Sequence, residues 1–115
     1  MKIDVFNVIG ENCITLEDGH KIYAMLYPEL SAGSNVELDF ENVKIFASPF
    51  FNSAIGRLLK DFKPDDLNRL LKITNLTSTG MSVLKRVIEN AKEYYTNPDM
   101  RKAVDDVLLE QSQNL

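Results

Sequence analysis

The sequence predicts one α/β domain over residues 1–115, with a mixed sheet of about four strands and helices packed on it. Its length of 115 residues and its hydrophobic content of 44% suit a domain with a single core. Segments in which apolar and polar residues alternate, as in strands, are followed by segments in which apolar residues have helical spacing. This order of elements is typical of sheets with parallel strand pairs. No internal repeat or low-complexity linker divides the chain.

An N-terminal hairpin and a helix are expected first. Residues 3–8 are rich in strand-forming side chains, residues 10–12 carry a turn signal, and residues 13–16 can return as a second strand. A helix should open at Asp18, because the following apolar residues share one helical face: Ile22, Met25, Leu26 and Leu30. Pro28 removes a backbone donor and should kink or shorten this helix.

The clearest strand signal lies at residues 36–40, where apolar and acidic side chains alternate strictly. Residues 43–46 continue the apolar character to a sheet edge. A helix is predicted from about Pro49, since proline suits the first turn of a helix. Its inward stripe consists of Phe51, Ala54, Ile55, Leu58 and Phe62.

The second half of the chain predicts one more strand and two helices. Residues 64–66 mark a break, and residues 70–74 form a short strand. A helix over residues 81–95 has an apolar stripe of Leu84, Val87, Ile88, Ala91 and Tyr95. A C-terminal helix capped at residues 97–98 has a stripe of Met100, Ala103, Val104, Val107 and Leu108.

The charge balance disfavours nucleic acid and membrane partners. The formal net charge is −4, whereas binding to phosphates needs clustered Lys and Arg. No apolar stretch reaches the roughly 20 residues that span a bilayer. Asp4 interrupts the position where a signal peptide would begin its apolar run, so we expect a cytoplasmic protein.

Few side chains suit catalysis, so no enzymatic activity, cofactor or metal is expected. The single cysteine, Cys13, is interpreted as a buried apolar thiol, and the single histidine, His20, as a solvated or capping residue. One His and one Cys do not supply the three or four ligands of a zinc site. The adjacent acidic pairs at residues 65–66 and 105–106 diverge on a helix and form no carboxylate dyad.

Residues 77–80, Thr-Ser-Thr-Gly, precede a predicted helix and allow two interpretations. They can cap the helix, or their backbone donors can hold an anion. The spacing lacks the glycines and the lysine of a phosphate loop, which favours capping. The anion-binding interpretation is retained as the alternative function, a small ligand- or anion-binding domain.

Residues 36–59 resemble the central unit of a STAS domain, the fold of anti-sigma-factor antagonists. The shared pattern is a strand ending in Asp39-Phe40, an acidic turn, a second apolar piece, and a loop with Ser48 that opens a helix. The chain resembles the STAS-like domain of unknown function more closely still. In that family the loop reads Ser then Phe, and the next strand ends in Asn, as at Ser48, Phe50 and Asn75.

The resemblance implies a non-catalytic protein-interaction module of a regulatory or signalling system. Its implied partner is an ATPase-type kinase or another signalling protein. STAS antagonists typically carry Asp-Ser-Ser-Gly in this loop, with the second Ser phosphorylated. Here Ala47 replaces the Asp, Pro49 occupies the acceptor position and Phe50 replaces the Gly, so we expect a module without the usual phosphoacceptor. Ser48 is either a helix N-cap or part of a docking surface.

The predicted partner-binding surface is the Ser48 loop and the outer side of the following helix. It comprises eight residues: Ser48, Pro49, Phe50, Asn52, Ser53, Gly56, Arg57 and Lys60. Gly56 is notable because a glycine inside a helix costs about 1 kcal/mol relative to alanine. Its presence suggests a close approach, either by another part of this chain or by a partner. Arg57 and Lys60 would offer positive charge to that partner.

Overall fold

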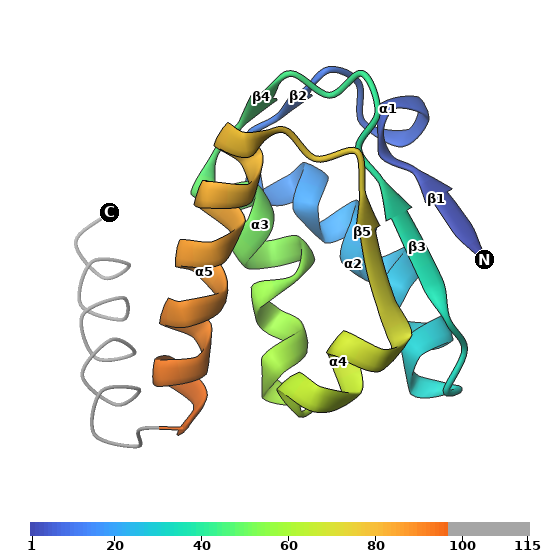
Figure 1. Ribbon diagram of the computed structural model, residues 1–115, viewed down its shortest axis with the longest axis vertical. Helices are drawn as coiled ribbons and strands as arrows, with labels where there is room; N and C mark the ends of the chain where they lie inside the picture. The colour runs from blue at the N-terminus through green and yellow to red at the C-terminus, as the bar shows by residue number, and fades with distance from the viewer. Residues whose placement is uncertain (97–115) are drawn as a thin grey trace.

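The structure, a computed structural model, describes residues 1–96 of the chain (Figure 1). Its elements, in chain order, are β1 (Lys2–Asp4), α1 (Val5–Val8), β2 (Asn12–Cys13), α2 (Leu16–Ser31), β3 (Val36–Asp39), β4 (Ile45–Phe46), α3 (Ser48–Ala54), the 3-10 helix η1 (Gly56–Lys60), α4 (Pro64–Leu70), β5 (Leu71–Thr74) and α5 (Ser78–Thr96). The predicted C-terminal helix with its stripe from Met100 to Leu108 lies outside the described residues.

The strands form two parallel sheets. A central sheet has the order β1-β3-β5, and β2 pairs with β4 in a separate two-stranded ribbon. The predicted α/β class is therefore confirmed. The predicted mixed sheet of about four strands is wrong, because each of the three strand pairs among the described residues is parallel.

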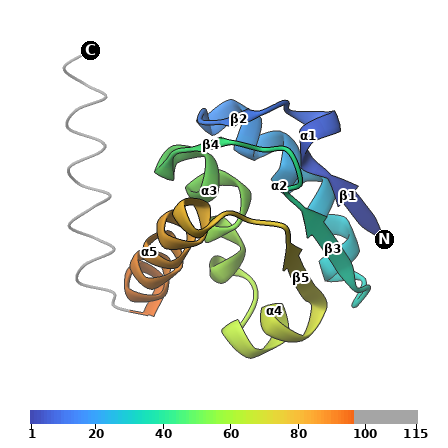
Figure 2. The same ribbon diagram turned by 45° about the horizontal axis from the view of Figure 1, so that its top comes forward.

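The central sheet has one buried face and one polar face. Ile3, Val36 and Leu38 point into the core and are almost fully buried. Alternation places Lys2 and Glu37 on the opposite face, where they are accessible to solvent. The helices gather on the buried face of the sheet (Figures 1 and 2). The strictly alternating pattern at residues 36–40 correctly predicted strand β3 and its buried side.

The N-terminal hairpin is not formed. The carboxylate of Asp4 accepts a hydrogen bond from the backbone N–H of Asn7 at 3.2 Å and caps the short helix α1. This cap turns the chain away after three strand residues, so β1 pairs with β3 and β2 pairs with β4. The strand-forming side chains of residues 5–8 alone could not show that Asp4 would be used in this way.

Helix α2 is longer than the sequence predicted. It begins at Leu16, because the Thr15 hydroxyl accepts a hydrogen bond from the backbone N–H of Asp18 at 3.1 Å. It continues to Ser31 with Pro28 inside it, so Pro28 does not shorten the helix. Ile22, Leu26 and Leu30 lie in the core as predicted.

Helices α2 and α3 pack in close contact at Gly19. A Cβ atom on Gly19 would lie 1.9 Å from the Ser53 Oγ atom and 2.3 Å from the Phe50 carbonyl oxygen. The Ser53 hydroxyl donates a hydrogen bond toward the Leu16 carbonyl oxygen, 2.8 Å away, and so joins the two helices. Gly19 is therefore required for this approach, since any larger residue would push the helices apart.

The helix predicted from Pro49 to Phe62 is divided in two. Ile55, with φ −124° and ψ −45°, leaves the α-helical conformation and separates α3 from η1. Pro64 begins helix α4 instead of marking a break. Strand β5 and helix α5 lie where the sequence predicted them. The start of β5 differs from the prediction by one residue and the start of α5 by three.

Among residues 1–96, none of the helices is both long enough and apolar enough to cross a membrane.

Candidate functional site

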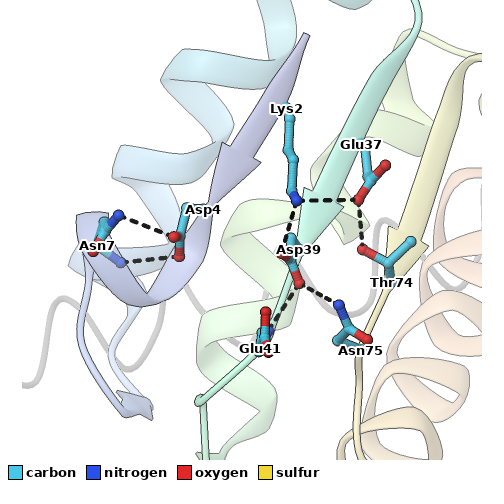
Figure 3. Close-up of polar contacts among 8 residues, drawn as sticks. All are labelled: Lys2, Asp4, Asn7, Glu37, Asp39, Glu41, Thr74 and Asn75. Carbon is cyan, nitrogen blue, oxygen red and sulfur yellow. Dashed lines mark hydrogen bonds and ion pairs between the residues drawn. The ribbon is translucent and has the colours of Figure 1, made fainter.

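A polar network lies at the carboxyl ends of β3 and β5 (Figure 3). The Asp39 carboxylate accepts hydrogen bonds from the Asn75 side-chain amide at 2.8 Å and from the backbone N–H of Glu41 at 3.0 Å. It also forms an ion pair with Lys2 at 3.3 Å, although its own side chain is almost buried. Asp39 therefore ties together β1, β3 and the residue that follows β5.

The network extends along the polar face of the sheet. The Thr74 hydroxyl donates a hydrogen bond to Glu37 at 3.0 Å, and Lys2 lies 4.0 Å from the same carboxylate oxygen of Glu37. The Asn75 amide and the Glu41 N–H hold the pKa of Asp39 below its usual value. The hydrogen bond to Asp39 and the charge of Asp39 raise the pKa of Lys2. Both groups are therefore held in their charged forms.

The sequence pattern had identified Asp39 and Asn75 as strand-terminal residues, but not their contact. In a parallel sheet the carboxyl ends of neighbouring strands meet at one edge, which explains why residues 36 positions apart bind each other. Asn75 has φ 58°, in the left-handed region that asparagine tolerates better than most residues. This conformation turns the chain from β5 towards α5.

The Ser48 loop forms the exposed start of α3. Ser48 and Pro49 are exposed, whereas Phe50 and Phe51, which follow directly, are fully buried. The residue that caps α3 is Ala47, and its side chain makes no capping hydrogen bond. The N-cap hypothesis for Ser48 is therefore wrong, and Ser48 occupies the first helical position.

Three residues of the predicted partner-binding surface are buried. Phe50 is 0% exposed, Ser53 is 4% exposed and Gly56 is also buried, so the prediction that they face outwards is wrong. The reason is that α2 covers Ser53 and α5 covers η1, so these positions lie between helices. Asn52 and Lys60 are exposed, as predicted.

The close approach at Gly56 comes from this chain. A Cβ atom on Gly56 would lie 3.3 Å from Val87 Cγ1 and 3.7 Å from the Ala91 Cβ atom, both on α5. This confirms the first of the two interpretations of Gly56, packing within the domain. Gly56 therefore carries no information about a partner.

Arg57 is exposed but its guanidinium contacts α2. The guanidinium carbon lies 4.3 Å from the centre of the Tyr23 ring, a cation–π arrangement. One of its nitrogen atoms donates a hydrogen bond to His20 Nδ1 at 2.8 Å. Since guanidinium nitrogens only donate, Nδ1 must accept, so this contact requires the neutral histidine with its proton on Nε2. The sequence indicated neither contact, because positions 20 and 57 lie far apart in it.

The other candidate residues for chemistry have structural roles. Cys13 is fully buried, and this burial, with a smaller contribution from Asp18, raises the pKa of its thiol to about 12. The Thr77 hydroxyl accepts a hydrogen bond from the backbone N–H of Gly80 at 3.1 Å, which confirms the capping interpretation of residues 77–80. Gly80 packs against Phe46 and Leu76, so the start of α5 rests on the β2–β4 ribbon.

Comparison with known proteins identifies a family for most of this structure. The family model of the STAS-like domain of unknown function matches residues 18–81, from the start of α2 to the first turn of α5. No curated protein and no solved structure matches the chain. The matched residues make up more than half of the chain and include Asp39, Ser48 and Asn75, so the chain belongs to the family of STAS-like domains of unknown function.

Proposed function

We propose that this chain is a non-catalytic protein-interaction module of a cytoplasmic regulatory or signalling system, similar in its mode of action to anti-sigma-factor antagonists. The observation that carries the proposal is the exposed corner at the start of α3. Ser48 and Pro49 are accessible, and the buried Phe50 and Phe51 anchor them to the core. A rigid, accessible corner suits recognition, because little side-chain entropy is lost on binding.

The proposed contact surface consists of the exposed members of the predicted set: Ser48, Pro49, Asn52, Arg57 and Lys60. Tyr23 and His20 hold the guanidinium of Arg57 in one orientation, which further limits the entropy lost on binding. Lys60 forms no ion pair with a residue of the described part of the chain. Its charge is thus free to steer a partner with an acidic surface, such as an ATPase-type kinase or another signalling protein.

A role without catalysis agrees with the state of the single cysteine and with the residue at the acceptor position. The Cys13 thiol has a pKa of about 12 and is buried, so it is protonated and inaccessible. Pro49 has no hydroxyl at the position where the family relatives with a phosphorylation switch carry the acceptor, which supports a module without that switch.

Site-specific cross-linking and one charge reversal test the proposal. A photoreactive residue at Asn52 should cross-link a defined partner in the native host, and the same residue at Asn90, an exposed asparagine of α5, should not. With the purified partner, Lys60→Glu should weaken binding by about tenfold, and its change in stability should stay below about 0.5 kcal/mol.

The matched control is Lys63→Glu, which reverses an exposed lysine three residues further along. Equal cross-linking at positions 52 and 90, or equal weakening by the two charge reversals, would show that the contact surface is not the binding site. Absence of any cross-linked protein would argue against the interaction module itself.

A further inference from the structure

One short segment of the chain carries acidic side chains and no basic ones. Residues 4–18 contain four acidic side chains, Asp4, Glu11, Glu17 and Asp18, and no Lys or Arg. This segment, which covers α1, β2 and the start of α2, therefore carries a formal charge of −4.

The same region exposes most of the accessible apolar side chains. Seven large apolar residues are exposed among residues 1–96, and five of them lie in this segment or on the strand paired with it. We call these five the cap surface: Phe6, Val8, Ile14, Leu16 and Ile45. The most exposed are Leu16 at 58% and Ile45 at 52%. Ile45 lies on β4 and Ile14 directly follows its paired strand β2, and exposed apolar groups on neighbouring strands commonly mark an interaction site.

The β2–β4 ribbon displays part of the cap surface on its outer face. Asn12 is paired with Ile45 and Cys13 with Phe46. Because side chains alternate along a strand, Cys13 and Phe46 point inwards, while Ile45 and Ile14 point outwards. The burial agrees, since Cys13 is fully buried and Ile14 is 40% exposed.

Strand β2 also has a free edge. The carbonyl oxygen of Glu11 accepts a hydrogen bond from the N–H of Ile45 at 3.1 Å, and that of Cys13 accepts one from the N–H of Ala47, the residue after β4, at 3.0 Å. The backbone groups of Asn12 and Ile14, which alternate with these, therefore point away from β4. Figure 2 shows β2 on the outer side of β4, away from α5. Such an edge is a template for an added strand.

We propose that β2 accepts an extended segment of a partner protein whose side chains alternate between apolar and basic residues. The segment adds to the free edge of β2 as a third strand, and its apolar side chains cover the part of the cap surface on the outer face of the ribbon, Ile14 and Ile45. Its Lys or Arg side chains meet the acidic residues before and after β2 in the sequence, Glu11 and Glu17. The Glu11 carboxylate already lies 3.9 Å from the Lys44 ammonium in an exposed ion pair, so Glu17 is the main acidic contact. Glu17 forms no ion pair with the described residues, so its charge is available. This inference rests on the proposed interaction function and names the kind of partner segment.

A synthetic peptide provides the direct test. The probe is the blocked hexapeptide Lys-Val-Lys-Val-Lys-Val, titrated into the isotopically labelled 115-residue chain and followed by NMR. The amides of Asn12 and Ile14 should show the largest shifts and gain protection from hydrogen exchange. A Glu-Val repeat of the same length tests the charge, and a Lys-Ser repeat tests the apolar contact. Neither control peptide should bind measurably.

Matched variants locate the binding. Ile45→Lys should raise the Kd of the Lys-Val peptide by about tenfold, since it adds like charge to the cap surface. Met81→Lys, at an exposed methionine outside the cap surface, should leave the Kd unchanged. Glu17→Lys and its control Glu93→Lys, an exposed residue on α5, provide a second pair that changes charge alone.

Equal binding of the Glu-Val peptide, equal effects of a variant and its control, or shifts centred away from β2 would each overturn the proposal. A dimer of the chain alone that Ile45→Lys dissociates would assign the cap surface to a second copy instead. If the partner cross-linked at Asn52 binds Ile45→Lys as tightly as wild type, the β2 inference fails and the proposed function stands. If no partner is cross-linked at all, the proposed function fails, whatever the peptide does.

Discussion

Asp39 is the residue on which most of the polar contacts at the carboxyl end of the sheet depend. It accepts from Asn75 and Glu41 and pairs with Lys2, so its negative charge is stabilised from three directions. The family pattern identified Asp39 and Asn75 as the last polar residues of their strands. Their separation of 36 residues made the 2.8 Å contact unpredictable from local sequence, because only the parallel pairing of β3 with β5 brings them together.

Asp39→Asn should lower the melting temperature at pH 7 and reduce its dependence on pH. The pKa of Asp39 is lowered in the folded state, chiefly by Asn75. Its contribution to stability is therefore present above the unfolded-state pKa of about 3.9, and it is lost as pH falls through the folded-state value. Thermal unfolding of both proteins between about pH 7 and pH 2 measures this, and the two curves should converge at the acid end.

The control for Asp39→Asn is Glu89→Gln, which neutralises an exposed carboxylate on α5. It should leave both the melting temperature and its pH dependence close to wild type. If the melting temperature of Asp39→Asn falls between pH 7 and pH 2 by as much as that of the wild type, the network contributes little to the stability of the folded state.

At the scale of elements, helix faces were predictable and helix junctions were not. The stripe at Phe51, Ala54 and Leu58 is buried as the helical spacing predicted, although the helix breaks at Ile55 and continues as η1. The break brings Gly56 against Val87 of α5. Helical periodicity reports which side chains avoid water, whereas the exact end of a helix depends on which element packs against it.

Gly56 and Val87 should be energetically coupled. Val87→Ala removes buried methyl groups and should cost about 2 kcal/mol. Gly56→Ala places a Cβ atom 3.3 Å from Val87 Cγ1, so the Val87 side chain must shift by a few tenths of an ångström unless it is shortened. In a double-mutant cycle measured by urea unfolding, Gly56→Ala/Val87→Ala should therefore be more stable than the sum of the two single losses, by about 1 kcal/mol.

Additive losses in that cycle would contradict the packing of η1 on α5. A control cycle pairs Gly56→Ala with Leu26→Ala. Leu26 lies on α2, and a Cβ atom at Gly56 would have its nearest neighbours on α5 and at Asn52 instead. These two changes should add, because they share no contact.

At the scale of the whole molecule, two parallel sheets take the place of the single mixed sheet that the sequence predicted. The pairing of β2 with β4 joins the N-terminal segment to the segment before Ser48, and it encloses Cys13 in the core. The thiol is thus shielded by packing from two distant parts of the chain. The reactivity of the Cys13 thiol therefore shows whether β2 and β4 stay paired in solution.

Alkylation of Cys13 by iodoacetamide at pH 8 should be about a thousandfold slower than that of a free thiol. Burial raises its pKa to about 12, against about 8.5 for a free cysteine, so only a minute fraction is thiolate. The rate should rise about tenfold per pH unit while the fold is intact, because the thiolate fraction does so. Alkylation can be followed by mass spectrometry.

The control is Asn12→Cys in a Cys13→Ala background, which moves the thiol to the exposed neighbouring position. It should react at the rate of a free cysteine. Equal rates for the two positions in native protein would mean that the β2–β4 ribbon is open in solution.

The sequence alone determined the α/β class, the strand at residues 36–40, the strand β5, the apolar faces of α2, α3 and α5, and the family. These features follow from the local order of apolar and polar side chains, which is written in short windows of the chain. Tertiary structure decided the pairing of β1 with β3 and of β2 with β4, the Asp39–Asn75 and Arg57–His20 contacts, and the burial of Ser53 and Gly56. Each of these joins residues that are distant in sequence, and which of the possible partners meet depends on how the whole core packs.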